Sequence, residues 1–335
     1  MTKLKIAVIG LGRIGEMHLK NLLKLPELFQ VTGIADPARD DLKHLADQYR
    51  IPHYSRDYHD LLAQEDVESV LIASATDTHA QIIHDAAEAD KDILCEKPID
   101  TDVNRIKELL SFVKGAGVKL QIGFNRRFDH NFLQIKKYVT DGKLGTPQIV
   151  KISSRDPELP SLDYVKHSGG LFFDMMIHDL DLIRYLSGSE VKEVTAKGAV
   201  LVNPKIGELG DIDTAIVTLK FANGALGVID NSRQAVYGYD QRAEVFGNKG
   251  MAKADNDRNS TVELDCKDST SLDKMPYFFI DRYQGAYLNE LVAFHDTVTE
   301  NKPLIANGED GLRAVQLAAA CQQSLESGQT VQLNY

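Results

Sequence analysis

Short apolar runs alternate with amphipathic segments over the first ~125 residues. The apolar runs predict strands and the segments with helical periodicity predict helices. The expected strands cover 5–10, 29–36, 69–75, 92–98 and 119–124, and the expected helices 14–24, 39–48, 79–89 and 102–113. Repeated alternation of strand and helix is typical of a parallel sheet with right-handed crossovers.

The pattern changes after Phe124. Two helices are expected at 130–139 and 170–186, and a run of strands follows at 191–202, 213–221, 224–234, 242–247 and 260–265. The segments FANGAL and FGNKGM read as hairpin turns. Two closing helices are expected at 281–300 and 308–327. The sequence predicts an α/β chain: a dinucleotide-binding domain of the Rossmann type over 1–124, then an α+β domain over 125–335 with a large open, mostly antiparallel sheet.

Length and composition exclude several classes of protein. A chain of 335 residues exceeds what one core usually organises. The net charge of -11 argues against nucleic acid or an anionic membrane as the main partner. Three cysteines without a CxxC pair support neither a disulfide framework nor a zinc site, and no apolar run is long enough to span a bilayer. We therefore expect a cytoplasmic protein without a metal.

Glycines at 10, 12 and 15 form the motif GLGRIG between the first strand and the first helix. Gly10 permits a tight turn, Gly12 lets the backbone approach a pyrophosphate, and Gly15 allows the helix to pack closely on the sheet. The helix N-terminus then offers free N–H groups to phosphates. The motif predicts a dinucleotide site.

Asp36 ends the next strand, 21 residues after Gly15. A carboxylate at this point accepts hydrogen bonds from the ribose hydroxyls of the adenosine, which favours NAD. A 2′-phosphate would be repelled there, although nearby Arg39 leaves some tolerance of NADP open.

Two further segments carry candidate chemistry. The motif CEKP at 95–98 places Lys97 at the carboxyl edge of the parallel sheet, where ligands bind in open α/β folds. In GGLFFDMMIHDLDL at 169–182, the spacing of Asp174, His178 and Asp181 predicts one face of a helix. A metal site or a buried polar network would show the same three residue types.

Through GLGRIG, the EKP at 96–98 and the pattern GGxxxDxxxHDxD at 169–181, the chain resembles the Gfo/Idh/MocA family of nicotinamide-dependent sugar and polyol dehydrogenases. Within that family it is most similar to the inositol 2-dehydrogenases, through GFNRRFD at 123–129 and YGYD at 237–240. The resemblance covers nearly the whole chain. It implies a Rossmann domain, an α+β domain with an open sheet, a homotetramer and no metal.

The resemblance also implies the catalytic roles. Lys97 matches the lysine that hydrogen-bonds the reacting oxygen, Asp174 the orienting carboxylate, and His178 the general acid/base. These roles suit alcohol oxidation, because an imidazole can accept the hydroxyl proton while an ammonium stabilises the developing alkoxide.

The remaining site residues are carried over in the same way. The expected cofactor contacts, besides Asp36 and the three glycines, are Arg13, Ile14, Thr76, His79, Glu96 and Lys97. The expected substrate contacts, besides Lys97, Asp174 and His178, are Arg127, Asp156, Tyr237 and Tyr283. Structural alternatives are a surface ion pair for Arg127, packing roles for the two tyrosines and a helix-cap role for His79.

These observations predict NAD-dependent oxidation of a small cyclic polyol, myo- or scyllo-inositol, to the 2-keto-inosose. The alternatives are a dehydrogenase of another sugar or sugar derivative in the same family, and a non-catalytic NAD-binding regulator.

Overall fold

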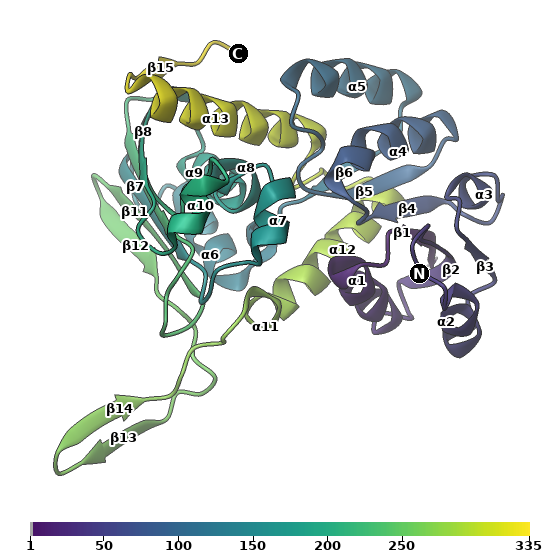
Figure 1. Cartoon of the computed structure of the whole chain (residues 1–335), viewed down its shortest axis with the longest axis horizontal. Helices are drawn as coiled ribbons and strands as arrows, with labels where there is room; N and C mark the ends of the chain where they lie inside the picture. Colours follow the sequence, from purple (N-terminus) through teal and green to yellow (C-terminus); the bar gives the residue numbers. More distant parts are fainter. Residues whose placement is uncertain (1–2) are drawn as a thin grey trace. The chain divides into compact units, whose positions relative to one another are not determined.

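The computed structural model describes residues 3–335 and divides into two compact units (Figure 1). The first unit contains the chain up to Phe128 together with Gly285–Val315, and the second contains Asp129–Gln284 and Gln316–Tyr335. The expected division after residue 124 did not include the return of 285–315 to the first unit. The physical reason is burial, because Leu291 and Phe294 are fully buried in the core of the first unit.

The first unit is built on a parallel sheet with the strand order β3-β2-β1-β4-β5-β6. Its strands are β1 (Leu4–Ile9), β2 (Phe29–Ala35), β3 (His53–Ser55), β4 (Ser69–Ile72), β5 (Asp92–Glu96) and β6 (Leu120–Gly123). This is the order of dinucleotide-binding folds, with the switch point between β1 and β4. The carboxyl ends of these two strands lead directly into the turns that hold the candidate cofactor residues.

Helices cover both faces of this sheet. They are α1 (Arg13–Leu23), α2 (Leu42–Tyr49), α3 (His59–Leu62), α4 (Thr76–Glu88), α5 (Val103–Ala116) and α12 (Gln284–Glu300), with the 3-10 turn η1 (Asn125–Phe128) after β6. Figure 1 shows α4 and α5 on one face and α1, α2 and α12 on the other. The strands are buried on both sides, which explains their continuous apolar runs.

The second unit is built on a mixed sheet with the order β12-β11-β7-β10-β9-β8-β15. Its strands are β7 (Pro147–Arg155), β8 (Val191–Ala199), β9 (Thr214–Phe221), β10 (Leu226–Ser232), β11 (Asp240–Gly247), β12 (Gly250–Ala254) and β15 (Val331–Gln332). β7 and β10 pair in parallel, and the other neighbours are antiparallel. The expected open, mostly antiparallel sheet is confirmed.

Strict alternation of burial shows that this sheet has one covered and one open face. In β9, Ala215, Val217 and Leu219 are buried, whereas Ile216 and Thr218 between them are exposed. The helices of this unit are α6 (His130–Thr140), α7 (Leu162–His167), α8 (Leu171–Asp174), α9 (Ile177–Ser187), α10 (Pro204–Glu208) and α11 (Phe279–Arg282); α13 (Gly308–Ser327) begins in the first unit and ends in the second. α6 and α9 pack on the covered face.

The single helix expected over 170–186 is wrong, because the structure has α8 and α9 with a break at Met175 and Met176. The amides of both methionines donate to the carbonyl of Leu171, so the hydrogen-bond ladder gains one extra residue at this point. Such an insertion shifts the helical register. Asp174 and His178 therefore lie on different helices, and the spacing of one helical turn does not apply to them.

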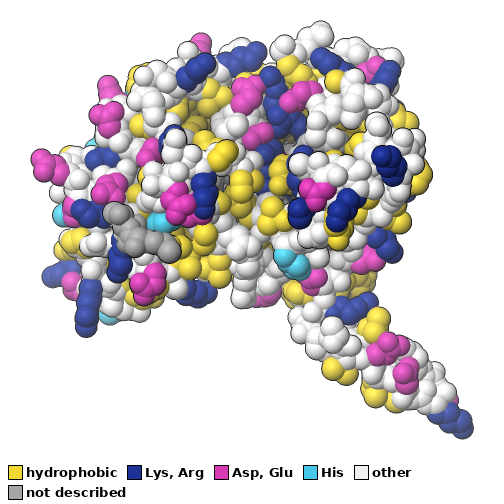
Figure 2. Space-filling view, turned by 180° about the vertical axis from the view of Figure 1, so that it is seen from behind, with side chains coloured by type: hydrophobic (Ala, Val, Ile, Leu, Met, Phe, Trp, Pro, Cys, Tyr) yellow, Lys and Arg dark blue, Asp and Glu magenta, His cyan; other side chains and the backbone are white. Residues whose placement is uncertain are grey.

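A hairpin of β13 (Glu263–Cys266) and β14 (Ser269–Leu272) extends away from the sheet of the second unit (Figure 1). All eight of its strand residues are exposed. Figure 2 shows apolar and charged side chains along it, and the exposed apolar residues include Val262 and Leu264. An isolated two-stranded hairpin is marginally stable in water, so this one gains from packing against another surface.

Among residues 3–335, no helix has the length and hydropathy needed to cross a membrane.

Candidate active site

The three glycines of the motif after β1 have distinct surroundings. Gly10 has φ +86°, and a Cβ there would lie 2.4 Å from the backbone nitrogen of Ser74. A Cβ on Gly15 would lie 1.9 Å from the carbonyl oxygen of Gly10. A Cβ on Gly12, by contrast, would meet no atom of the described chain within 4 Å apart from its neighbours. Gly10 and Gly15 are therefore required by packing, whereas Gly12 leaves open space above the loop.

The first turn of α1 is open to a ligand. Gly12 caps the helix without any side-chain hydrogen bond to the backbone N–H groups. Gly12 and Arg13 are exposed and Ile14 is half-buried. Unsatisfied N–H groups and the helix dipole favour an anion at this position. The loop therefore has the open space and the electrostatic character that suit the diphosphate of a dinucleotide.

Asp36 lies at the end of β2 and is tied to the glycine loop. Its carboxylate accepts hydrogen bonds from the amides of Leu11 at 2.7 Å and Ala38 at 2.8 Å. Each carboxylate oxygen can accept a further bond, so the residue can still receive ribose hydroxyls. Arg39 donates to the carbonyl of Leu11 and pairs with Glu16 and Asp41.

The ends of β4 and β5 are joined by a buried histidine. Nδ1 of His79 lies 2.8 Å from the carbonyl oxygen of Pro98, and Nε2 lies 3.1 Å from that of Ser74. Burial lowers the pKa of His79, which favours the neutral ring. A neutral ring carries a single N–H and donates to one of these two carbonyls, so the imidazole lies between two turns at the carboxyl edge of the sheet and is hydrogen-bonded to one of them. Thr76 is exposed at the start of α4.

Lys97 follows β5 directly and is half-buried at the same edge. Glu96, the last residue of β5, pairs with His18 of α1 at 2.7 Å. Its side chain lies over Gly123 of β6, where a Cβ would approach the Glu96 carboxyl carbon to 3.0 Å. The carboxyl edge of the first unit therefore collects the glycine loop, Asp36, Thr76, Glu96 and Lys97, as the sequence predicts.

Asp174 and His178 belong to the second unit, and both are half-buried. The Asp174 carboxylate accepts hydrogen bonds from the Tyr164 hydroxyl at 2.7 Å and from the Arg233 guanidinium at 3.1 Å. Arg233 is 1% exposed and also faces Asp211 at 3.6 Å. Arg233 is not among the residues expected from the sequence, where its only signal is a charged residue directly after β10.

The helix that carries His178 is anchored through the next residue. Asp179 is fully buried and accepts hydrogen bonds from Asn231 at 3.1 Å and Gln241 at 3.0 Å, which lie on β10 and β11. Both carboxylate oxygens of Asp179 are thereby bonded to the sheet. This anchor fixes the start of α9 and, with it, the position of the His178 backbone.

Arg127 and Tyr283, two of the predicted substrate residues, are buried within their units. Arg127 is 4% exposed, donates to the carbonyl of Ile305 at 2.6 Å and pairs with Asp310 at 3.0 Å. Tyr283 is 1% exposed, beneath the guanidinium of Arg282. These contacts show a structural role for each residue, and the substrate role stays a prediction.

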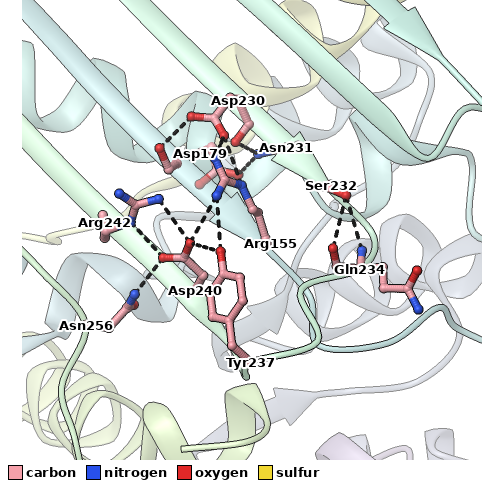
Figure 3. A network of polar contacts seen from close by, with 11 residues as sticks. Arg155, Asp179, Asp230, Asn231, Ser232, Gln234, Tyr237, Asp240, Arg242 and Asn256 are labelled. Carbon is pink, nitrogen blue, oxygen red and sulfur yellow. Dashed lines mark hydrogen bonds and ion pairs between the residues drawn. The ribbon is translucent and has the colours of Figure 1, made fainter. Parts of the chain in front are cut away.

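Tyr237 and Asp156 lie at the ends of sheet strands. The Tyr237 hydroxyl donates to Asp240 at 2.7 Å and accepts from Arg155 at 3.1 Å, within a network that includes Asp230 (Figure 3). Burial opposes ionisation of Asp240, but hydrogen bonds from Arg242, Asn256 and Tyr237 outweigh it and lower the pKa of this carboxyl. Asp156 follows β7 and its backbone bonds to Ser232 and Ala235.

Two family models and several curated proteins match this chain. Residues 4–124 match the model of the oxidoreductase family with an NAD-binding Rossmann fold, and residues 132–253 match the GFO/IDH/MocA C-terminal domain. An uncharacterized oxidoreductase, YrbE, of Bacillus subtilis is 50% identical over 100% of this chain and 98% of its own length. Myo-inositol 2-dehydrogenase of Thermotoga maritima is 44% identical, with 98% of each chain covered.

A solved structure gives the same result for the fold. The scyllo-inositol dehydrogenase of Lactobacillus casei with bound NAD(H) and scyllo-inositol superposes with a TM-score of 0.92. It is 28% identical, and the match covers 99% of each chain. With its family models, its relatives and its fold in agreement, the chain belongs to the GFO/IDH/MocA family of oxidoreductases.

Proposed function

We propose that this protein is an NAD-dependent inositol 2-dehydrogenase that oxidises myo- or scyllo-inositol to the 2-keto-inosose. The observation that carries this proposal is the carboxyl edge of the first unit, where an open glycine loop, Asp36 and the strand-end Lys97 lie together. Relatives that match this chain over nearly its whole length are inositol dehydrogenases.

The residues at this edge fit NAD. The helix start of α1, which no side chain caps, and the open space over Gly12 suit the diphosphate. Asp36 would accept the adenosine ribose hydroxyls, while Thr76 and Glu96 would lie on the nicotinamide side. Arg39 is held by Glu16 and Asp41, whose two carboxylates offset its charge, so a 2′-phosphate gains little there and NAD is preferred.

Three side chains of this chain would carry the proton chemistry. His178 would accept the proton of the reacting hydroxyl, and Lys97 would hydrogen-bond the same oxygen as it gains alkoxide character. Asp174 would orient them, and hydrogen bonds from Tyr164 and Arg233 hold its carboxylate in place. NAD, when bound, supplies the acceptor for the hydride that leaves the substrate carbon.

Recognition of the other ring hydroxyls is proposed for Arg127, Asp156, Tyr237 and Tyr283. Tyr237 supports this role best, because its ring is 53% exposed and its hydroxyl is already polarised by Arg155 and Asp240. Arg127 and Tyr283 would contribute mainly by shaping the surroundings, because both are buried.

The test is a steady-state screen for NADH formation with NAD and a panel of inositol isomers, hexoses and sugar acids. We expect the highest kcat/KM with myo- or scyllo-inositol, and loss of turnover in Lys97→Ala and His178→Ala. A higher kcat/KM with a hexose would show that the substrate is a hexose, while the proposed NAD-dependent alcohol oxidation would still stand. Wild-type turnover of His178→Ala at neutral pH would contradict the assignment of the base.

Assembly through the open face of the sheet in the second unit is also proposed, as a homotetramer of a cytoplasmic enzyme of inositol catabolism. Two observations support this assembly. Apolar residues are exposed on this face, including Ile216, Leu226 and Phe246, and every strand residue of the hairpin of β13 and β14 is exposed. Light scattering should give four chains per particle, with Ile216→Asp reducing the mass. A monomeric wild type at micromolar concentration would contradict this.

A further inference from the structure

A largely buried cluster of one histidine and two carboxyls lies beneath the Lys97 end of β5, and Glu96 is the only one of its three members to which the roles above refer. It consists of His18 from α1, Glu96 from β5 and Glu290 from α12, and one ligand atom of each lies within 4.8 Å of the other two. His18 is 1% exposed and Glu290 is 0% exposed. All three belong to the first unit.

Glu290 is an unusual member of this core. Among residues 3–335, neither of its carboxyl oxygens has a hydrogen-bond partner. An ionised carboxylate in this position would be strongly destabilising, because it has lost its water and gained no donor. Burial, together with the negative charge of Glu96, raises the pKa of Glu290 well above its ordinary value. A neutral carboxylic acid is therefore the form that this position accommodates.

The other two members define where the proton of Glu290 can go. The Nε2 of His18 lies 2.7 Å from the Glu96 carboxylate, whereas its buried Nδ1 has no partner among the described residues. Because Nε2 faces the Glu96 carboxylate and Nδ1 faces no acceptor among the described residues, the ring donates to Glu96 from Nε2. Glu96 then accepts from His18 and offers further lone pairs toward Glu290. A side-chain rotation or one bridging water would complete that bond.

The polar groups around Glu290 come from three neighbouring elements. They are His18 from α1, Glu96 from β5 and the amide of Gln121 from β6, which donates to the Glu290 backbone carbonyl at 3.1 Å. On α12 itself, the ring of Tyr287 lies edge-on to His18, with 5.5 Å between centroids. Glu96 therefore carries the negative charge of the cluster, one residue before Lys97.

We propose that Glu290 is a positioning residue for Lys97, acting as a neutral carboxylic acid that, with His18, holds the Glu96 carboxylate at the end of β5. Ionisation of Glu290 would place two carboxylates side by side, and their repulsion would displace the strand end that bears Lys97. The proposal rests on the proposed function only for the role of Lys97.

The test compares Glu290→Gln, Glu290→Ala and the control Glu300→Gln, which changes an exposed glutamate at the end of the same helix. The first readout needs no substrate: the infrared spectrum of the wild type should contain the carbonyl band of a buried carboxylic acid, which Glu290→Gln removes and Glu300→Gln retains. Absence of that band overturns the proposal, whatever the substrate proves to be.

The second readout is the pH profile of kcat and KM on the cyclitol that the wild type oxidises. Near pH 6, the neutral isostere Glu290→Gln should keep kcat within about twofold of wild type, whereas Glu290→Ala should lose about tenfold or more in kcat with little change in KM. As the pH rises, wild-type kcat should fall relative to that of Glu290→Gln. Equal losses in both variants near pH 6, or identical profiles of wild type and Glu290→Gln, would overturn the proposal.

The same three residues could instead hold a divalent metal, and this outcome is measured directly. Elemental analysis of the purified wild type should find less than one tenth of an equivalent of zinc or manganese, and added Zn²⁺ should not raise its melting temperature. If the wild type bound one equivalent of metal and Glu290→Gln bound none, the cluster would hold a metal ion rather than a proton, and the proposal would be overturned.

Discussion

Gly12 and Gly15 lie three residues apart, at the cap and in the first turn of α1, yet replacing each by alanine should damage a different property. At Gly12 the added Cβ meets open space, and the backbone angles, φ -67° and ψ -169°, are accessible to alanine. At Gly15 the added Cβ would lie 1.9 Å from the carbonyl oxygen of Gly10. Gly12→Ala should therefore fold normally and bind NAD poorly, whereas Gly15→Ala should destabilise the first unit itself.

The magnitudes follow from these contacts. An ordinary contact begins at 3.4 Å, so the Gly10 backbone would have to move about 1.5 Å to accept alanine at position 15. Overpacking of this kind costs about 3 kcal/mol, which lowers the melting temperature by roughly 6–12 °C. Alanine at position 12 is a poorer helix cap than glycine but restricts the unfolded chain, and these effects offset to within about 1 kcal/mol.

For the affinity for NAD the order is reversed, and Gly12→Ala should show the larger effect of the two variants. A methyl group at position 12 occupies the space through which the diphosphate approaches the helix N-terminus. The Kd of Gly12→Ala for NAD should therefore rise about 10- to 100-fold, or roughly 1.4–2.8 kcal/mol. Calorimetric titration with NAD and a thermal scan without it separate the two effects. If Gly12→Ala bound NAD as tightly as the wild type, the diphosphate would not pass over Gly12.

Three further changes test other parts of the molecule. Asp36→Ala removes the acceptor of the Leu11 amide and of the ribose hydroxyls, so kcat/KM with NAD should fall at least about tenfold while that with NADP changes little. Arg233→Met leaves the Asp174 carboxylate without its buried cation, which should cost about 3–5 kcal/mol in chemical denaturation; a loss below about 1 kcal/mol would show that the pair is dispensable. Because the pKa of Glu290 is raised in the folded protein, the unfolded chain releases this proton at a lower pH than the folded chain does. The contribution of the protonated Glu290 to the free energy of unfolding is therefore fully present below the ordinary pKa of 4.5 and is lost as the pH rises through the folded pKa. Within that window the free energy of unfolding of the wild type should fall by about 1.4 kcal/mol per pH unit relative to Glu290→Gln, and parallel stability curves would contradict it.

The local pattern of apolar and polar residues was sufficient to predict most strands and helices of the first unit. Strands buried on both faces appear as continuous apolar runs, and the helices between them have clear apolar stripes. β3 was missed because three residues carry too little periodicity, and β7 because its segment mixes lysine, serine and arginine with isoleucine and valine. The break between α8 and α9 was missed because the apolar periodicity continues through Met175 and Met176, while the backbone inserts one residue there.

The sequence by itself determined the cofactor loop, because the requirements on Gly10, Gly12 and Gly15 are local: a turn, an open approach and a close contact within six residues of chain. It also determined that Asp36 and Lys97 follow strands of one parallel sheet, β2 and β5, since the carboxyl ends of all parallel strands lie at the same edge.

Only the tertiary structure decided which charges become buried and what faces them. Arg127 is paired with Asp310, and His18 with Glu96, across long stretches of chain. A charged residue has the same local pattern whether it ends in solvent, in an ion pair or as a neutral acid. Its state depends on desolvation and on partners that chain topology brings together, and neither is encoded in the residues beside it.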